Sequence, residues 1–327
     1  MKFFSTILLL FTVFYCSIAQ DTEKKKTGGY TFTDKHTVKY SPVKNQYQSG
    51  TCWSFATISF VESEILRNGG SEYDLSEMFF VYYAYIQKSW DYVSYHGNNN
   101  LSEGGQAHDV MNIMKKYGLV PEDVYKGLNY GEEKHIHAEM VAMLKGMLDG
   151  LLKNENTRLS TAWKSSVECI LSSYLGDVPS QFTAGGKKHT PESYLKETGI
   201  NPDEYIELTS CNHVPFYEKF ILKIPDNWSR DLYYNLPLDD FIAVVDHALE
   251  NGYSVCWDGD VSENEFSFKN GVAIVPEKPW SEMNTGERLA LYTEITPERK
   301  ITQETRQKEF ENFSTSDDHL MHIVGIG

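Results

Sequence analysis

The sequence contains few cysteines, few basic residues and, after its first 20 residues, no apolar run long enough to span a membrane. It also has no internal repeat, no low-complexity linker and no Cys-x-x-Cys pair. The five cysteines are scattered over 327 residues, which argues against a disulfide scaffold. With 30 basic and 46 acidic side chains, the formal net charge is −16. Such a charge repels nucleic acid and anionic lipid, so we expect neither as a partner and no stable membrane insertion.

The first 19 residues have the features of a secretory signal peptide. Lys2 is followed by the apolar run FFSTILLLFTVFY and then by small residues at Ser17 and Ala19, after which cleavage is expected. A lipid anchor on Cys16 is the alternative, but the bulky residues before this cysteine disfavour it. Cleavage removes one positive charge and leaves a net charge of −17. The sequence therefore predicts an exported protein, periplasmic or extracellular.

The rest of the chain divides into a helical part and a strand-rich part. Apolar residues recur at helical spacing in four stretches, 53–66, 75–90, 102–118 and 132–152, and the helical pattern continues through residue 171. Thr51 and Ser76 are the expected N-caps of the first two helices. After a further helix at 237–252 come the β-like runs YSVCWDGDV, GVAIV and LMHIVGIG. We expect an α+β protein with a mainly helical domain at residues 20–234 and a β-rich domain at residues 235–327.

Cys52 has the surroundings of a reactive thiol. It opens the first helix, where exposed N–H groups stabilise a thiolate and are expected to lower the thiol pKa. Gly50 allows the backbone to approach a ligand closely. Acyl transfer also needs donors for the oxyanion, and these are expected to be the Cys52 backbone N–H and the side-chain amide of Gln46.

The general base for Cys52 has to be a histidine from elsewhere in the chain. The C-terminal segment SDDHLMHIVGIG offers His319 and His322. Side chains alternate along a strand, so the two are expected to point to opposite faces, and only one of them toward Cys52. A metal site on this pair is disfavoured, because the faces are opposed and no third ligand is clustered nearby.

The segment QYQSGTCWSF resembles the active-site signature of papain-like cysteine peptidases. In that family a Gln, five intervening residues and Cys-Trp recur, as they do at Gln46, Cys52 and Trp53. LSE at 75–77 and EGGQAHDVMNIMKKYGLVPE at 103–122 continue the resemblance. It implies that Gly104, Gly105 and Trp53 bind substrate, the two glycines by hydrogen-bonding an extended peptide.

The same resemblance distinguishes the two histidines. The family's catalytic His is followed six residues later by a Gly within a β-run, which fits His319 and Gly325 but not His322. His319 is therefore the expected base, and His322 is expected on the other face of the strand.

Several features resemble the bleomycin hydrolase/aminopeptidase C branch of this family. About 265 residues separate Cys52 from His319, the Gly-Gly segment lacks the disulfide cysteine usual in secreted papain relatives, and GYSVCWDGDVSE precedes the β-rich part. The branch implies a papain-like two-domain fold, with a large helical insertion at about 132–227 in the helical domain and a β-barrel-like second domain. The family's Asn-Ser-Trp-Gly motif and the branch's C-terminal arm do not occur before Gly327, so we expect the β-barrel-like domain to be truncated and the chain to be a fragment.

The resemblance implies a cysteine peptidase that hydrolyses peptide bonds through a thioester, as an aminopeptidase, with a peptide or protein substrate and no metal or organic cofactor. Two alternatives remain. One is a non-catalytic papain-like module that binds peptides without turnover, and the other is a transglutaminase-like acyl transferase, which the spacing of Gln46 and Cys-Trp disfavours. Whether the protein forms a homo-oligomer is left open by the sequence.

Overall fold

The computed structural model describes residues 29–155 and 158–327, so the predicted signal peptide lies outside the described residues. The α-helices are α1 Cys52–Arg67, α2 Glu77–Ser94, α3 Ala107–Tyr117, α4 Ala138–Leu152, α5 Ala162–Leu175, α6 Pro191–Thr198, α7 Leu238–Glu250, α8 Thr285–Ala290 and α9 Gln303–Glu311. Short 3₁₀ helices cover Pro202–Glu204 and Trp280–Glu282. Among these described helices, none combines the length and the apolar character that a membrane span needs.

The strands are short and form several small sheets. They are β1 His36–Thr37, β2 Phe182–Ala184, β3 Lys187–His189, β4 Leu208–Thr209, β5 Lys219–Ile221, β6 Leu232–Asn235, β7 Val255–Gly259, β8 Phe266–Ser267, β9 Val272–Ala273, β10 His319–Ile323 and β11 Gly325–Ile326. The pairs β1–β11, β7–β10, β2–β3 and β8–β9 are antiparallel, and β6 lies between parallel β4 and antiparallel β5. Over the described residues no barrel closes, so only the mixed helix-and-strand class of the prediction is confirmed.

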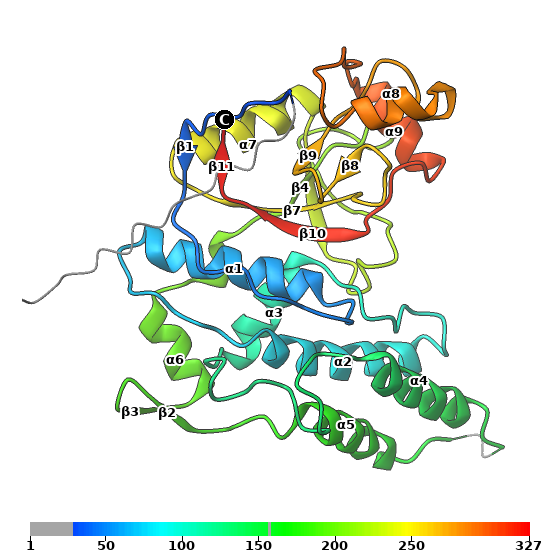
Figure 1. Ribbon diagram of the computed structural model, residues 1–327. Helices are drawn as coiled ribbons and strands as arrows, with labels where there is room; N and C mark the ends of the chain where they lie inside the picture. The colour runs from blue at the N-terminus through cyan, green and yellow to red at the C-terminus, as the bar shows by residue number, and fades with distance from the viewer. Residues whose placement is uncertain (1–28, 156–157) are drawn as a thin grey trace, which may run out of the picture.

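Helix α1 is the centre of the molecule. It packs on strand β10 on one side and on helices α2 and α3 on the other, so the strands and the helical layer meet along it (Figure 1). Apolar side chains from all of these elements join one core, which includes Ile58 and Val61 of α1, Phe79 of α2, Ile113 of α3 and Leu320 of β10. Helices α4 and α5 pack on each other and on α2, as the far layer of the same core.

Most helix boundaries follow from local chemistry. The Ser76 hydroxyl accepts a hydrogen bond from the Phe79 N–H and caps α2, as predicted. Thr51 holds the N-cap position of α1, but its hydroxyl lies 2.6 Å from that of Ser49 and does not cap a helix N–H, so this part of the prediction is wrong. Gly118, at φ 82°, ends α3 in a backbone conformation that favours glycine.

Helix α4 begins at Ala138, six residues after the predicted start at 132. The backbone before it is used in a β-bridge between Ile136 and Gln48, in which the Gln48 N–H donates to the His135 carbonyl at 2.9 Å. A residue whose backbone pairs in this way cannot also continue a helix. The bridge fixes the insertion to the loop that leads into Cys52.

Lys44 joins that same loop to the two central helices. Its Nζ lies 2.8 Å from Glu77, 3.3 Å from Glu62 and 2.7 Å from Asp74. The Glu62 side chain is 1% exposed, and the Leu75 N–H also donates to it at 2.8 Å. Burial raises the pKa of Glu77 to about 7, while the charge of Lys44 acts to lower it. Lys44 is therefore the counter-charge for two carboxylates that would otherwise be buried without one.

Replacing Lys44 with Met should lower the free energy of unfolding by about 3–5 kcal/mol at pH 8, because Glu62 and Glu77 then lose their cation inside the protein. The loss should shrink near pH 5, where both carboxyls can bind protons. Lys145→Met is the matched control, since Lys145 forms an exposed ion pair with Asp149 on α4, and should cost about 0.5 kcal/mol. Urea unfolding at both pH values measures these differences. Equal losses for the two variants would contradict the account.

A second buried charge joins α3 to the strand region. His108 is buried and its Nδ1 lies 2.5 Å from Glu207, with Asp109 and Asp231 within 4 Å of its Nε2. Burial alone would lower the pKa of His108, but the hydrogen bond to Glu207 and the charges of Asp109 and Asp231 raise it to about 9. The imidazolium is thus the form that the folded protein holds at neutral pH.

This pKa predicts a loss of stability in mild alkali. Unfolded His108 releases its proton near 6.5 and folded His108 near 9, so its contribution is complete below pH 6.5 and disappears as the pH rises through 9. The shift corresponds to at most about 3 kcal/mol. Unfolding in urea between pH 6.5 and 9 should show this decline in the native protein and a flatter profile in His108→Gln. His247→Gln, at an exposed residue of α7, should keep the native slope; a His108→Gln profile as steep as the native one would show that another group is responsible.

Candidate active site

Cys52 occupies the first position of α1 and is half-buried. Its sulfur lies close to the backbone of Leu320, the second residue of β10. The loop before it is fixed by Glu103, whose side chain accepts a hydrogen bond from the Gly50 N–H at 2.6 Å. Gly50 was expected to let the backbone approach a ligand closely, but in the structure the group that lies against it is the side chain of Glu103. The predicted nucleophile thus lies where α1, β10 and the Gly-Gly segment come together.

The pKa of the Cys52 thiol is raised, which contradicts the prediction from the helix terminus. Burial is the largest cause, and the charges of Asp258 and Asp226 add to it. Hydrogen bonds from the backbone of Leu320 and Trp53 act in the opposite direction but do not reverse the shift. The helix N-terminus favours a thiolate, as expected, but the sequence did not reveal the carboxylates that the fold places around the sulfur.

His319 begins β10 and pairs with Gly259 of β7. It is half-buried, and its ring has no hydrogen bond or ion pair with any other residue of the described chain. Because Leu320, its neighbour, lies against Cys52, His319 stands at the same end of α1 as the thiol. The structure therefore brings the two predicted catalytic residues to one place without a direct bond between them.

His322 lies on the face of β10 that packs on α1. Its Nδ1 lies 2.9 Å from the hydroxyl of Ser59, and its ring packs edge-on against Phe60. Ser59 is seven residues after Cys52, so His322 contacts α1 about 10 Å along the helix from its first residue. Burial lowers the pKa of His322 to about 4, so its ring is neutral near pH 7. His322 is a packing residue of the core helix.

Gln46 is half-buried in the loop before Cys52. Its side-chain Nε2 donates to the Ser49 carbonyl at 2.7 Å, and the Ser49 hydroxyl donates back to the Gln46 carbonyl at 2.7 Å. These two bonds fix the turn between Gln46 and the nucleophile. A primary amide has two N–H donors, so one remains for the predicted oxyanion contact.

The Gly-Gly segment lies directly beside α1. The indole Nε1 of Trp53 donates to the Glu103 carbonyl at 3.0 Å, and a Cβ on Gly105 would come within 3.0 Å of the Trp53 ring. Trp53 is only 1% exposed, which leaves little of its surface for direct contact with a substrate. It positions the segment instead, because the small surface of Gly105 lets the backbone rest on the indole.

Asp258 and Asp226 lie near the thiol, Asp317 lies near Asp226, and no sequence motif predicts any of the three. Asp258 of β7 accepts a hydrogen bond from Gln106 Nε2 at 2.8 Å, and its pKa is raised to about 7 by burial and neighbouring carboxylates. The pKa of Asp317 is raised to about 6, mainly by burial. Asp226 lies against Gly104. The segment CWDGD contains one of them and SDDH another, but neither pattern indicates that the side chains lie in this region.

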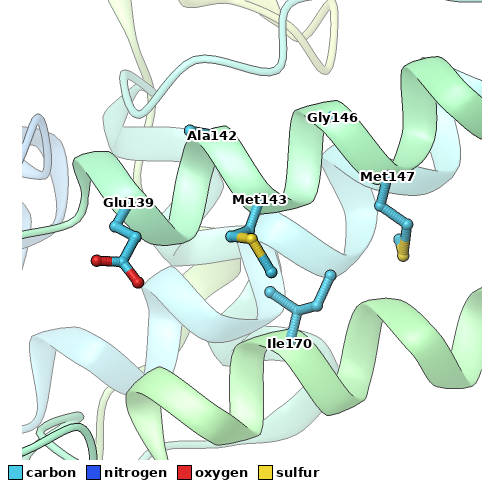
Figure 2. Close-up of a pocket in the computed structure, with 6 residues that line it drawn as sticks. All are labelled: Glu139, Ala142, Met143, Gly146, Met147 and Ile170. Carbon is cyan, nitrogen blue, oxygen red and sulfur yellow. The ribbon is translucent and has the colours of Figure 1, made fainter.

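The described residues contain no disulfide bond and no candidate metal site. Their four cysteines are unpaired, and nowhere among them do three His, Cys, Asp or Glu side chains form a group suited to a metal ion. An apolar groove of about 590 Å³ lies between α4 and α5 (Figure 2). It is lined by Glu139, Ala142, Met143, Gly146, Met147 and Ile170, none of which belongs to the candidate site.

Comparison with known proteins identifies the family to which this site belongs. The family model described as "Peptidase C1-like family" matches residues 13–276, which include Gln46, Cys52 and both glycines but end before His319. The chain belongs to the Peptidase C1-like family. Its relatives include Cysteine proteinase 1, mitochondrial, of Saccharomyces cerevisiae, with 26% identity over 131 residues, 35% of this chain and 27% of that protein.

Mouse bleomycin hydrolase is 22% identical over 304 residues, which cover 76% of this chain and 66% of that protein. The chain thus spans less than two thirds of the length of these relatives. The crystal structure of PepW from Lactobacillus rhamnosis superposes with a TM-score of 0.69 at 19% identity, over 90% of this chain and 72% of that one. The resemblance to the bleomycin hydrolase branch of this family is confirmed.

The raised pKa makes a prediction about Cys52 in the substrate-free protein. Iodoacetamide should modify Cys52 more slowly at pH 7 than it modifies Cys169, the exposed thiol of α5, because only the thiolate reacts. Asp258→Asn should move the Cys52 rate profile to lower pH by removing a nearby negative charge. Peptide mass spectrometry after timed labelling measures both sites in one sample. Faster labelling of Cys52 than of Cys169 at pH 6 would contradict this and indicate a thiolate already paired with His319.

Proposed function

We propose that the protein is a cysteine peptidase in which Cys52 is the nucleophile and His319 the general acid and base. The observation that supports this most strongly is the position of Cys52, at the N-terminus of the central helix and against the strand that His319 begins. The Peptidase C1-like family match over the nucleophile and the Gly-Gly segment supports the same assignment. The His319 ring has no hydrogen bond or ion pair with any other described residue, which leaves its nitrogens for proton transfer.

The reaction follows from these positions. His319 takes the proton of Cys52, and the sulfur attacks the carbonyl carbon of the scissile peptide bond. The Cys52 N–H and the free amide hydrogen of Gln46 donate to the oxyanion. The carbon–nitrogen bond then breaks, and His319 gives its proton to the leaving amine. Water then attacks the thioester carbonyl while His319 takes a proton from that water. His319 passes the proton to the Cys52 sulfur as the carbon–sulfur bond breaks, and the carboxylic acid is released.

The finer features of the proposal are an aminopeptidase activity on peptides and export from the cytoplasm. The similarity to bleomycin hydrolase and the signal-peptide pattern of residues 1–19 support them. The glycines Gly104 and Gly105 would lie along the acyl half of the substrate, because their segment is beside the nucleophile. Whether the protein is a homo-oligomer is not part of the proposal.

Hydrolysis of aminoacyl fluorogenic amides tests the two catalytic roles. Cys52→Ala should abolish turnover, and His319→Ala should lower kcat/KM by about a hundred- to ten-thousand-fold, the usual contribution of a general acid–base. His322→Gln is the matched control: it keeps a hydrogen-bonding group toward Ser59 and should change kcat/KM by less than about threefold while lowering stability by about 1 kcal/mol.

The controls also separate the alternatives. If the native protein and Cys52→Ala both hydrolyse these amides only at the background rate, the protein is the peptide-binding module and not an enzyme. A larger loss of kcat/KM in His322→Gln than in His319→Ala would show that the base has been assigned to the wrong histidine.

A further inference from the structure

Asp226 lies directly over the first glycine of the Gly-Gly segment. It belongs to the loop between β5 and β6, within the region that we expected to be a family insertion. A Cβ added to Gly104 would come within 2.0 Å of Asp226 Oδ2, so only glycine lets the carboxylate rest there. If the acyl half of a substrate runs from Cys52 along Gly104, its path meets the Asp226 carboxylate.

The loop is held rigidly in this position. Asn100 donates to Asp226 Oδ1 at 3.0 Å and to the Pro225 carbonyl at 2.8 Å. Two residues further on, Trp228 is buried and its indole donates to Asp109 at 2.9 Å. The Asp226 carboxylate is therefore fixed on both sides by the same core that holds the Gly-Gly segment. A substrate would meet a preformed wall at this point.

The second oxygen of Asp226 is available to a ligand. Over residues 29–155 and 158–327, Oδ2 accepts no hydrogen bond. Lys88 is the nearby cation, but it is 1% exposed and its Nζ donates to the carbonyls of Ser102 and Gly104. The Lys88 charge attracts the Asp226 carboxylate without bonding to it.

Asp226 lies near two further carboxylates, Asp317 and Asp258. The Asp226 backbone N–H lies near the carboxyl group of Asp317, two residues before His319. One oxygen of Asp317 and one of Asp258 are buried and have no hydrogen-bond partner among the described residues. The charges of Asp226 and Asp258 both act on Cys52. Within the part of the chain that the structure describes, no cationic side chain bonds to the carboxylates of Asp226 and Asp258 near the nucleophile.

From this geometry we propose that Asp226 is the specificity-determining residue of the peptidase and binds the protonated amino terminus of the substrate. This inference rests on the proposed peptidase function and deepens it. An ammonium group has three N–H donors and one positive charge, which suits the free Oδ2. The loop that carries Asp226 also blocks the path of a longer acyl chain, so the same residue would both bind a free amino terminus and exclude an internal peptide bond.

A lysine side chain carries the same ammonium group and would suit the same oxygen. The position over Gly104 favours the amino terminus, because the carboxylate lies against the backbone segment along which the substrate main chain is expected to run. A lysine-specific endopeptidase is therefore the outcome that the experiment has to exclude.

The first experiment compares two fluorogenic dipeptide amides, identical except that one has a free amino group and the other an N-acetyl group. The native protein should prefer the free form, and Asp226→Asn should lower its kcat/KM by about 10- to 100-fold, the usual size of one charge-assisted contact. The kcat/KM of the acetylated form should not fall. The matched control is Asp246→Asn, an exposed aspartate of α7, which should leave the preference unchanged. An acetylated lysine-containing dipeptide amide cleaved as well as the free form would overturn the proposal.

The second experiment does not depend on turnover. Cys52→Ala, with Asp226 intact, should bind the free dipeptide amide at least tenfold more tightly than its acetylated counterpart in calorimetry, and Asp226→Asn in the same background should remove the difference. Equal affinities for the two ligands in Cys52→Ala would overturn the assignment of Asp226, whatever the activity of the native protein. A lack of Cys52-dependent hydrolysis together with selective binding would instead contradict only the proposed peptidase function.

Discussion

The ion pairs of Lys44 are the interaction on which the centre of this structure depends. Helix α1 is buried on nearly every side, and its face toward α2 includes Glu62, a carboxylate almost completely removed from water. Burying such a charge is unfavourable unless a cation and hydrogen bonds compensate for it. Lys44 supplies the cation from the loop that contains Gln46, two residues further on. The same contacts that make α1 a stable core helix therefore also hold Gln46, the proposed oxyanion donor, in the loop before its N-terminus.

The carboxylates packed along α1 and those near its first residue differ in whether a cation pairs with them. Around Glu62 and Glu77, the protein places Lys44 within ion-pair distance of both carboxylates. Near Cys52 it places Asp226 and Asp258, with Asp317 beside Asp226, and the nearby Lys88 bonds to backbone carbonyls. The charges of Asp258 and Asp226 raise the pKa of the Cys52 thiol and so disfavour its thiolate in the substrate-free protein. The arrangement is understandable if the missing positive charge arrives with the substrate.

Capping residues and glycines in the sequence correctly predicted several helix ends, because these ends depend on the chemistry of a few neighbouring residues. Ser76, Gly118 and the glycines after Arg67 mark helix ends in the sequence, and the structure has those ends. The late start of α4 was not predictable, because it results from the pairing of Ile136 with Gln48, 88 residues earlier in the chain. The roles of Cys52, Gln46 and Trp53 were predicted together from the resemblance of QYQSGTCWSF to a family signature, and such a motif does not reveal that Trp53 is buried. Asp226 and Asp258 have no motif of their own, and only the tertiary fold brings them to Gly104 and the thiol.

The position of Asp226 also links substrate binding to activation of the nucleophile. A bound ammonium group would offset the negative charge that Asp226 exerts on Cys52, and the thiol pKa would fall when a substrate with a free amino terminus is present. The coupling is reciprocal, because the free energy by which the ammonium stabilises the thiolate equals the free energy by which the thiolate strengthens ammonium binding. An acetylated or internal peptide segment provides no such charge and leaves the thiol protonated. Selectivity would then arise twice, once in binding and once in the fraction of reactive thiolate, from a single carboxylate over a single glycine.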